Sequence, residues 1–374
     1  MIARCVYRRL LSMESLETRR ILAPIANGQA LLDSFAVGGS REFEFHVDRG
    51  DFVRFAVGEN DNGADAVLTI SAPGGQTVSV NRGSGGVVAQ FEAPASGEYQ
   101  AIVTENGNNS GLAFAARFVA LPGTPSLLAG RDAQLTSGQQ FASSFGTGGF
   151  NLHPFQADAG DLVRVAVGEI DNGADSVLQV FSPGGDRIDI VAESGGSVLQ
   201  FNAPLSGTYT ALVSEDGNNS DLAYAIRFAS FPGDSTLIAQ RDATLGNGEV
   251  SATSFGVGGF NLHPFDADAG DTVRVAVGET DNGADSVLQV ISPNGQRLAI
   301  ESESGGSVIQ FDAPVAGTYT ALVSENGTEA TTGWKPVGSS LIVSYGLKSF
   351  AHEGLSYTFA AVPASVVFVG ASRQ

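Results

Sequence analysis

Cysteine is almost absent from this chain of 374 residues, and Cys5 is its one copy. A single cysteine cannot form a disulfide within the chain, and cysteine-rich zinc sites are excluded as well. The scarcity of cysteine does not argue against export, because a unit of about 100 residues can bury enough apolar surface to fold without cross-links.

Basic residues are also scarce: 20 Lys and Arg face 40 Asp and Glu, for a formal net charge of −20. Nucleic acids and anionic lipid surfaces both require a positive footprint, so this composition excludes nucleic acid as a partner. An acidic surface favours divalent-cation binding, but simple solvation explains the same charge without any ligand.

Long apolar runs are missing too, and we expect no transmembrane segment. Residues 1–23 contain Arg4, Arg8 and Arg9, but no apolar run of a secretory signal follows them. The stretch Glu14–Ala23 resembles a short Leu-Glu-x-Arg-x-Leu-Leu/Ile-Leu motif near the N-termini of large, β-rich exported bacterial proteins. The resemblance implies an export or sorting segment at 1–23 and an extracellular or cell-surface protein. A chance amphipathic helix is the alternative.

Repetition dominates the rest of the chain. The stretch Val53–Asp65 returns as Val163–Asp175 and as Val273–Asp285, offset by 110 residues each time. Each copy has the pattern of a strand, an acidic loop rich in Gly and Asn, and a second strand. A period of this length predicts whole domains rather than the rungs of a solenoid.

We therefore predict three domains after the N-terminal segment. They are repeat 1 at 24–122, repeat 2 at 126–232 and repeat 3 at 236–374. Pro and Gly at the joins end strands and favour turns. The joins are short, so we expect neighbouring repeats to touch. Repeats 2 and 3 are the closest pair, with four differences between Ser144–Val180 and Ser254–Val290.

Repeat 2 contains eight candidate strands. They lie near 143–147, 151–157, 162–168, 176–182, 186–192, 197–202, 208–214 and 222–230. In Leu222–Phe228 the large apolar residues alternate with smaller or polar ones. Alternation with a period of two predicts antiparallel strands with one face against a second sheet. The predicted fold is all-β: three tandem antiparallel β-sandwiches of jelly-roll-like type.

The end of repeat 3 departs from the pattern. Residues 328–354, which include Trp334, Lys335 and Lys348, replace the sequence expected there, and the repeat pattern resumes at 355–363. We interpret 328–354 as an insertion or foreign sequence that displaces the last strand. An altered reading frame is the alternative.

Three motifs carry a family resemblance, and in repeat 2 they are Phe155–Val165, Gly173–Gly185 and Phe201–Val213. Together they resemble the bacterial pre-peptidase C-terminal domain, and counterparts occur in the other two repeats. The resemblance implies a β-sandwich that serves as an accessory module of secreted enzymes, often proteases. It also implies relatives that bind calcium or polymeric substrates.

The motifs of a catalytic domain are lacking. The sequence has no His-Glu-x-x-His helix, no Gly-x-Ser-x-Gly elbow and no recognisable protease triad. We therefore expect a non-catalytic structural or binding protein, with an extracellular protein or polysaccharide as its partner. One alternative is an accessory substrate-binding module for a separate peptidase or other hydrolase, and a hydrolase with an unfamiliar site is another. His153 and His263 are expected to pack on the sandwich surface.

The acidic loops are candidate calcium sites, because four oxygen-bearing positions recur within seven residues of each copy. They are Glu59, Asp61, Asn62 and Asp65; Glu169, Asp171, Asn172 and Asp175; and Glu279, Asp281, Asn282 and Asp285. Calcium prefers about six to eight oxygen ligands, although this spacing is not that of an EF-hand. Asx turns in a strand connection are the alternative. A second polar cluster, at 105–110, 215–220 and 325–328, is placed to complete a metal site at the same end of the sandwich.

Overall fold

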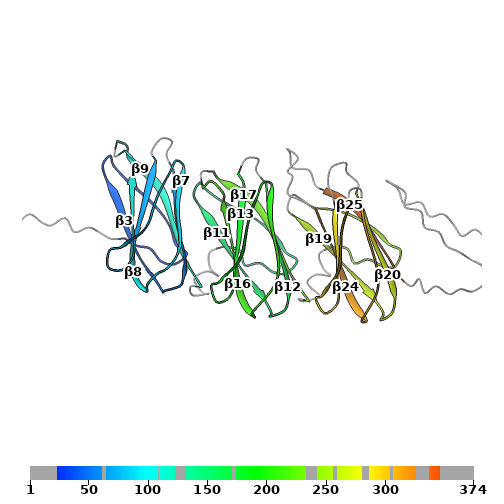
Figure 1. The fold of residues 1–374 in the computed structure, drawn as a ribbon. Helices are drawn as coiled ribbons and strands as arrows, with labels where there is room; N and C mark the ends of the chain where they lie inside the picture. The colour runs from blue at the N-terminus through cyan, green and yellow to red at the C-terminus, as the bar shows by residue number, and fades with distance from the viewer. Residues whose placement is uncertain are drawn as a thin grey trace, which may run out of the picture.

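The structure is a computed structural model that describes most of the three repeats. The described residues are 23–60, 65–107, 109–122, 132–170, 174–218, 220–232, 242–255, 259–279, 286–303, 306–325 and 337–345. They form strands and turns, and Figure 1 shows three sandwiches standing in a row. Within these ranges there is no helix that could cross a membrane.

Eight strands make up repeat 2. They are β10 (Gln140–Phe145), β11 (Phe150–Ala157), β12 (Leu162–Glu169), β13 (Ser176–Phe181), β14 (Arg187–Glu193), β15 (Gly196–Asn202), β16 (Gly207–Glu215) and β17 (Leu222–Phe231). Each corresponds to one of the eight strands predicted from alternation and turn residues. The all-β, antiparallel sandwich prediction is therefore confirmed.

Repeats 1 and 3 contain the corresponding strands. In repeat 1 these are β1 (Ala23–Pro24), β2 (Ala30–Phe35), β3 (Ser40–Val47), β4 (Phe52–Glu59), β5 (Ala66–Ser71), β6 (Thr77–Gly83), β7 (Gly86–Glu92), β8 (Gly97–Glu105) and β9 (Leu112–Leu121). In repeat 3 they are β18 (Val250–Phe255), β19 (Phe260–Ala267), β20 (Thr272–Glu279), β21 (Ser286–Ile291), β22 (Arg297–Glu303), β23 (Gly306–Asp312), β24 (Gly317–Glu325) and β25 (Val337–Tyr345).

Each repeat folds as two antiparallel sheets. In repeat 2 one sheet has the order β10-β17-β12-β15 and the other has the order β11-β16-β13-β14. The first strand thus neighbours the last, and successive strands alternate between sheets except at the β13–β14 hairpin, which is a jelly-roll arrangement. Repeat 1 has an additional strand, β1, which pairs in parallel with β3. Because β1 begins at Ala23, repeat 1 starts one residue before the predicted boundary at 24. We name the sheet that contains β10, and its counterparts in repeats 1 and 3, the leading sheet. The sheet that contains β11, and its counterparts, is the following sheet.

The last strand of repeat 3 comes from the segment predicted to be an insertion. β25 pairs with β18 and with β20, as β17 pairs with β10 and β12. Part of 328–354 therefore occupies the position of the last strand. The predicted resumption of the repeat pattern at 355–363 lies outside the described residues, as does 1–22 of the predicted export segment.

A separate aromatic core lies between the two sheets of each repeat. In repeat 2 the Phe155 ring is centred 4.5 Å from Phe228 and stacks on Tyr209 at 5.5 Å. The Tyr209 hydroxyl donates to the Leu205 carbonyl at 2.7 Å, which ties the core to a surface turn. Tyr99 and Tyr319 make the same bond in the other repeats. Burying the rings while satisfying the hydroxyl is how tyrosine serves a core.

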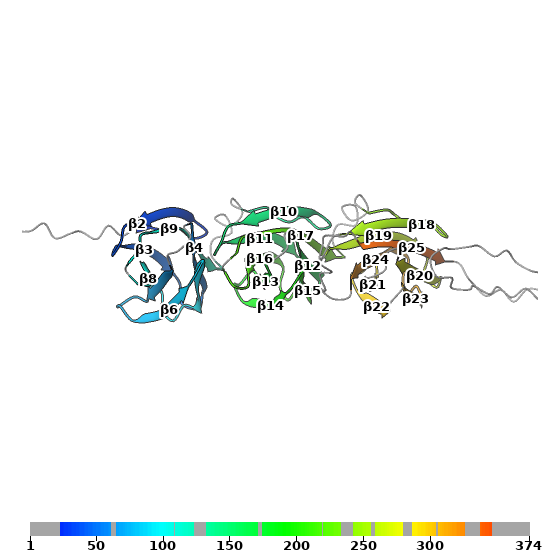
Figure 2. The ribbon, with the colours of Figure 1, turned by 90° about the horizontal axis from the view of Figure 1, so that it is seen from above.

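The repeats also pack on one another, sheet against sheet, as the view from above shows (Figure 2). A buried apolar cluster joins the leading sheet of repeat 2 to the following sheet of repeat 3. Its buried members are Leu162, Ala166, Ala229 and Phe231 on one side, and Phe260, Leu262, Ile291 and Leu322 on the other. A corresponding cluster joins repeats 1 and 2, with Ala56, Val119 and Leu121 facing Phe150, Leu152, Phe181 and Leu212.

Two arginines lie over one phenylalanine ring at the centre of each interface. The guanidinium carbons of Arg164 and Arg227 are 5.3 Å and 4.8 Å from the centroid of Phe260. Arg227 also donates to the Phe260 carbonyl oxygen, and it forms an ion pair with Asp242 at 2.7 Å. The Gln200 amide donates to the Gln289 amide oxygen at 2.9 Å. Cation–π contacts that exclude water are stronger than exposed ones.

The interface between repeats 1 and 2 repeats this chemistry. Arg54 and Arg117 lie 5.3 Å and 4.7 Å from the centroid of Phe150, and Arg117 pairs with Asp132 at 2.7 Å. Arg54 donates to Asn218 at 2.8 Å as well. Gly58 approaches repeat 2 so closely that a Cβ would lie 1.6 Å from the Thr147 carbonyl oxygen. Only glycine permits this backbone contact.

Double-sided packing leaves a clear trace in the burial of the strands. All residues of β12 except the last are buried, although its sequence places Arg164 on the outer face. In β20, at the end of the row, buried residues instead alternate with half-buried ones. A sheet covered on one face gives such alternation, whereas a sheet covered on both faces does not.

We predict that Phe260→Ser uncouples repeat 3 from repeat 2 without unfolding repeat 3. Ser40 occupies the same position in repeat 1, where the sandwich still forms. Removal of a buried phenylalanine costs about 3–5 kcal/mol, and here the loss falls mainly on the interface. In calorimetry the wild type should unfold in one transition and the variant in two.

The matched control is Ser40→Ala, which should leave the transition unchanged. A Phe260→Ser variant with the wild-type midpoint and a single transition would show that the interface contributes no coupling.

Candidate functional site

The strands before and after each acidic loop meet the loop at one end of the sandwich. In repeat 2, Glu169 joins the strand after the loop to the turn before β15. Its two carboxylate oxygens accept hydrogen bonds from the backbone amides of Ser176 at 2.6 Å and Gly195 at 3.0 Å. Ser176 begins the strand after the loop, and Gly195 lies in the turn before β15. Burial raises the pKa of Glu169, while the hydrogen bond from the Ser176 amide acts to lower it.

Repeat 1 has the same arrangement. Glu59 accepts from the amides of Ala66 at 2.6 Å and Gly85 at 2.9 Å. In repeats 1 and 2 the glutamate that precedes the acidic loop therefore joins the strand after the loop to a neighbouring turn. A carboxylate that already accepts two amide hydrogens offers fewer lone pairs to a cation.

The other predicted ligands are placed in part. Asp65 and Asp175 are exposed at the ends of their loops. The remaining candidates in the first two loops, Asp61, Asn62, Asp171 and Asn172, lie outside the described residues, and so do Asp281, Asn282 and Asp285. The backbone of Glu279 ends β20. Among the residues that can be placed, no cluster of three or more His, Cys, Asp or Glu has the spacing of a metal site.

The second polar cluster does lie beside the acidic loop. The Asp216 amide donates to the Asp175 carbonyl oxygen at 2.9 Å, and the Asn106 amide donates to that of Asp65 at 2.8 Å. The Glu215 carboxylate accepts from the Gly217 amide at 2.9 Å. The two clusters thus share one end of the sandwich, with backbone contacts between them.

The recurring histidines are buried, and the prediction that they pack on the sandwich surface was wrong. The side chains of His153 and His263 have no exposed area. Nδ1 of His153 lies 2.9 Å from the Ala133 carbonyl oxygen, so this nitrogen carries the proton, and Nε2 accepts from the Tyr224 hydroxyl at 2.6 Å. Burial lowers the pKa of His153 and keeps the ring neutral. His153 therefore links the two sheets of repeat 2.

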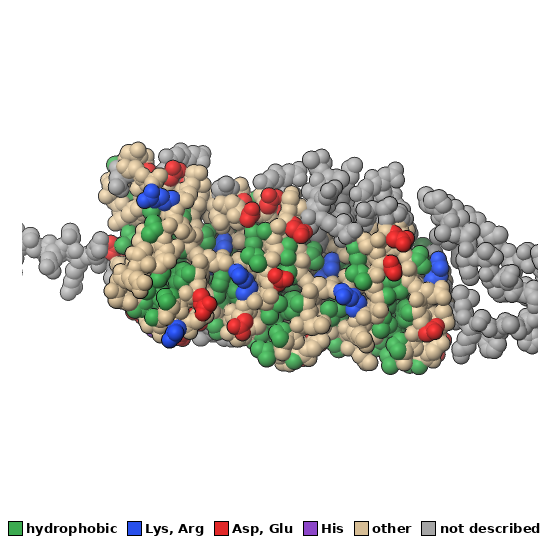
Figure 3. All heavy atoms as spheres, in the orientation of Figure 1, with side chains coloured by type: hydrophobic (Ala, Val, Ile, Leu, Met, Phe, Trp, Pro, Cys, Tyr) green, Lys and Arg blue, Asp and Glu red, His purple; other side chains and the backbone are tan. Residues whose placement is uncertain are grey.

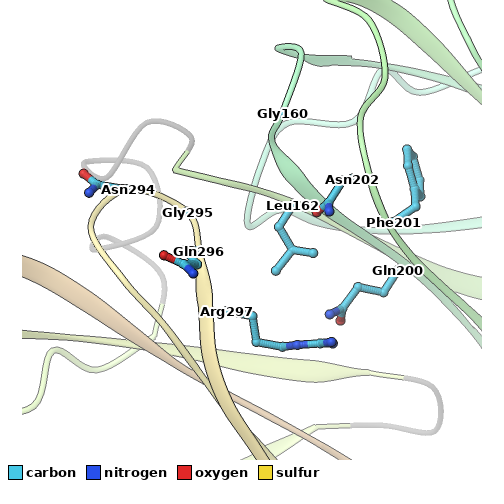
Figure 4. Close-up of a pocket in the computed structure, with 9 residues that line it drawn as sticks. All are labelled: Gly160, Leu162, Gln200, Phe201, Asn202, Asn294, Gly295, Gln296 and Arg297. Carbon is cyan, nitrogen blue, oxygen red and sulfur yellow. The ribbon is translucent and has the colours of Figure 1, made fainter. Parts of the chain in front are cut away.

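A shallow hollow opens at the seam between repeats 2 and 3 (Figure 4). It encloses about 470 Å³. Repeat 2 contributes Gly160, Leu162, Gln200, Phe201 and Asn202, and repeat 3 contributes Asn294, Gly295, Gln296 and Arg297. The polar lining consists of side-chain amides and one guanidinium, so it offers hydrogen bonds but no acid or base. The Phe201 ring packs on Tyr209 in the core, 5.9 Å between centroids, and gives the hollow no aromatic platform.

Acidic side chains do not gather into one patch on the face shown in Figure 3. They are spread over all three repeats and interspersed with a few basic ones. Dispersed acidic groups of this kind favour solubility rather than one strong cation-binding field.

Part of the chain matches a known protein family. Residues 259–325 match the family described as the bacterial pre-peptidase C-terminal domain. The match begins just before β19 and ends with β24, so repeat 3 contains a region similar to this domain. For repeats 1 and 2 the resemblance stays a prediction. No curated protein matches the chain.

Solved structures with low sequence identity align with parts of the chain. The pre-peptidase C-terminal domain of a collagenase from Bacillus anthracis is 13% identical, covers 28% of this chain and 98% of that one, and has a TM-score of 0.24. The periplasmic lysozyme inhibitor PliG from Aeromonas hydrophila is 19% identical, with 26% and 95% covered and a TM-score of 0.23. The tandem CBM22 domains of Xyn10C from Paenibacillus barcinonensis are 10% identical, with 55% and 98% covered and a TM-score of 0.18. No residue role is transferred from these proteins.

The interface arginines were missed by reasoning from sequence. Arg54, Arg164 and Arg274 recur at one position of a valine-rich strand, and alternation placed them on a solvent-facing side. Burial lowers the pKa of Arg54 and Arg164 to about 10, so both remain charged at neutral pH. In the sequence, Arg54 is accompanied by Phe150 in the next repeat, and Arg164 is accompanied by Phe260. This co-occurrence of an arginine and a phenylalanine in successive repeats is the signal that could have revealed the contact.

We predict that Glu169→Gln destabilises the protein in calcium-free buffer, because the amide can replace only one of the two acceptor oxygens. A lost hydrogen bond to a buried or charged group costs about 1–3 kcal/mol. Urea unfolding with a chelator present measures the change.

Asp175→Asn is the matched control, since it neutralises an exposed carboxylate of the same loop. It should change the free energy of unfolding by less than about 0.5 kcal/mol. Equal effects of the two variants would contradict the assignment of Glu169 as the residue that holds the loop.

Proposed function

We propose that this protein is an exported, non-catalytic array of three domains similar to the pre-peptidase C-terminal domain, which acts as a stiff structural or binding element. The observation that carries the proposal is the pair of equivalent sheet-on-sheet interfaces centred on Phe150 and Phe260. Domains joined by a buried apolar interface do not move freely relative to one another. A linear, stiff array suits a spacer or scaffold outside the cell.

The non-catalytic part of the proposal is supported by where the perturbed groups lie. Burial shifts the pKa values of Arg54, Arg164 and His153. The two arginines are covered by the next repeat, and His153 is enclosed between sheets. A catalytic group needs a shifted pKa together with access to substrate. These three lack that access. Burial also raises the pKa values of the half-buried Glu169 and Asp51, and both carboxylates already accept backbone amides in turns.

Calcium is the proposed stabilising ion of the acidic loops. Asp65 and Asp175 are exposed beside backbone carbonyls and a second polar cluster, and calcium accepts both kinds of oxygen. Glu59 and Glu169 are engaged by backbone amides, so the proposed ligands are the later positions of each loop. An ion there would hold the loops in place and stiffen the array.

An extracellular protein or a polysaccharide is the proposed partner. The acidic composition favours neither nucleic acid nor anionic lipid. The array offers long exposed side faces, and the amide groups of the seam hollow can form hydrogen bonds with polar chains.

The second candidate function is an accessory substrate-binding module for a separate secreted peptidase or other hydrolase. The seam hollow, with Arg297 and Gln200 extending into it, is the observation that favours it (Figure 4). Retention of the wild type on insoluble polysaccharide or collagen, with loss of retention for Arg297→Ala, would support this candidate. Equal retention of both proteins would remove it.

We predict saturable calcium binding by the full chain in titration calorimetry, together with a higher melting temperature. Ligand at 100 times its dissociation constant stabilises a folded protein by about 2.7 kcal/mol per site. Asp171→Ala combined with Asp175→Ala should remove about one third of the binding capacity, because one of three loops loses its ligands.

The matched control is Asp189→Ala, an exposed carboxylate on β14 at a distance from the loops in sequence. It should leave both capacity and melting temperature unchanged. If millimolar calcium gives neither heat nor a shift in melting, the loops are turns without an ion, and the calcium proposal fails.

A further inference from the structure

The outer face of the last leading sheet, β18-β25-β20-β23, differs from its two counterparts in being uncovered by any described residue. In repeats 1 and 2 the equivalent face lies against the next repeat. Arg54 and Arg164 are 4% and 7% exposed there, whereas Arg274 is half-buried. Val308 is 42% exposed, although Val198 packs against the interface cluster in repeat 2.

The uncovered face keeps the side chains that form the covered ones. Arg274, Ala276, Val308 and Gln310 stand where Arg164, Ala166, Val198 and Gln200 stand in repeat 2. Register confirms the equivalence, because Arg274 pairs with Gln310 as Arg164 pairs with Gln200. Among the described residues, the Arg274 guanidinium has no hydrogen-bond or ion-pair partner. The face thus carries a cation, an amide and an apolar side chain in the arrangement that contacts a neighbouring repeat elsewhere.

One difference alters what this face can bind. Ile342 pairs with Ala276 in the position where Arg227 pairs with Ala166. The sequence therefore lacks the second arginine at this register position, and no counterpart of Asp242 is required in the partner. The partner must therefore supply an aromatic ring to contact Arg274 and a side-chain amide to form a hydrogen bond with Gln310.

The two covered interfaces show what supplies those groups. In both, the next repeat presents a phenylalanine at the start of its second strand and a glutamine on its fourth. These are Phe150 with Gln179, and Phe260 with Gln289. A following sheet with these two side chains is the surface that fits.

The first repeat of a second copy does not present such a surface. Ser40, Thr69 and Ser71 stand where repeat 2 has Phe150, Gln179 and Phe181. Polar residues at these positions give no ring for Arg274 and little apolar area for Val308. Arrays of stacked units need a polar outer face at a terminal unit to remain soluble.

We propose that the outer face of β18-β25-β20-β23 binds a β-sandwich module on a separate polypeptide, through a following sheet that carries the phenylalanine and glutamine of repeats 2 and 3. Repeat 1 ends the stack at one end, and repeat 3 extends it at the other. The assignment does not depend on calcium binding by the acidic loops.

The test supplies the missing surface on the protein itself. The full chain with Ser40→Phe, Thr69→Gln and Ser71→Phe carries a following sheet of the repeat 2 type at its first repeat. A head-to-tail contact that does not close produces open chains. In sedimentation velocity the wild type should remain monomeric, and the variant should show a roughly twofold or greater rise in average mass with concentration.

Two further variants identify the surface that is used. In the triple variant, Val308→Asp should restore the monomer, because it places a charge in the contact. Ile300→Asp is the matched control, since Ile300 is 48% exposed on β22 of the other sheet, and it should leave the association intact. Association that survives Val308→Asp would overturn the proposal.

If the triple variant folds but does not associate, the proposal is also overturned. This holds even if the reason is that the chain's own C-terminal residues cover the face. Circular dichroism and a cooperative melt establish that the variant is folded. If the three substitutions prevent folding, Ser40→Phe alone provides the ring for Arg274, and the same two outcomes decide the matter.

Discussion

A phenylalanine ring held under two arginine guanidinium groups is the contact on which the arrangement of this protein depends. Removing a guanidinium group from water is costly, and it becomes favourable only when ring, carbonyl and carboxylate partners replace the lost hydration. Phe260 gives its ring and its carbonyl oxygen to Arg227, while Asp242 balances the charge. Because these partners come from the next repeat, or from the start of it, Arg227 gains them only when the repeats are stacked.

This requirement explains features that are otherwise unrelated. Gly58 has no side chain because the backbone of the next repeat touches it. β12 is buried along most of its length although it holds an arginine. Repeat 1, the first of the three repeats in this sequence, has Ser40 in place of the central phenylalanine. The array is therefore built from units that differ where their surroundings differ.

The fold of each unit could be predicted because period-two alternation and turn residues act locally. Leu222–Phe228 alternates in the sequence and forms β17 as expected. The stacking could not be predicted in the same way, since a face that looks solvent-exposed within one repeat is covered by another. Arg164 on a valine strand has the pattern of an outward charge, and only the partner ring explains its burial. His153 was assigned to the surface for the same reason, because its hydrogen-bond donor Tyr224 is 71 residues away.

The candidate site was predictable to a smaller extent. Closely spaced oxygens identified the loops, but spacing does not show which oxygens are already engaged. Glu59 and Glu169 precede the acidic loops of repeats 1 and 2 and accept backbone amides, a role that depends on Gly85 and Gly195 in distant turns. Of the predicted ligands that the structure describes, Asp65 and Asp175 are the ones exposed to solvent.

The claim that the three repeats form one stiff row is tested most directly by small-angle X-ray scattering from the full chain. The account predicts a distance distribution that a single straight row of three stacked sandwiches reproduces, at low and at high salt, because the contacts are buried. A distribution that requires a broad set of bent arrangements would contradict it, and would mean that the Arg–Phe contacts do not hold the repeats together in solution.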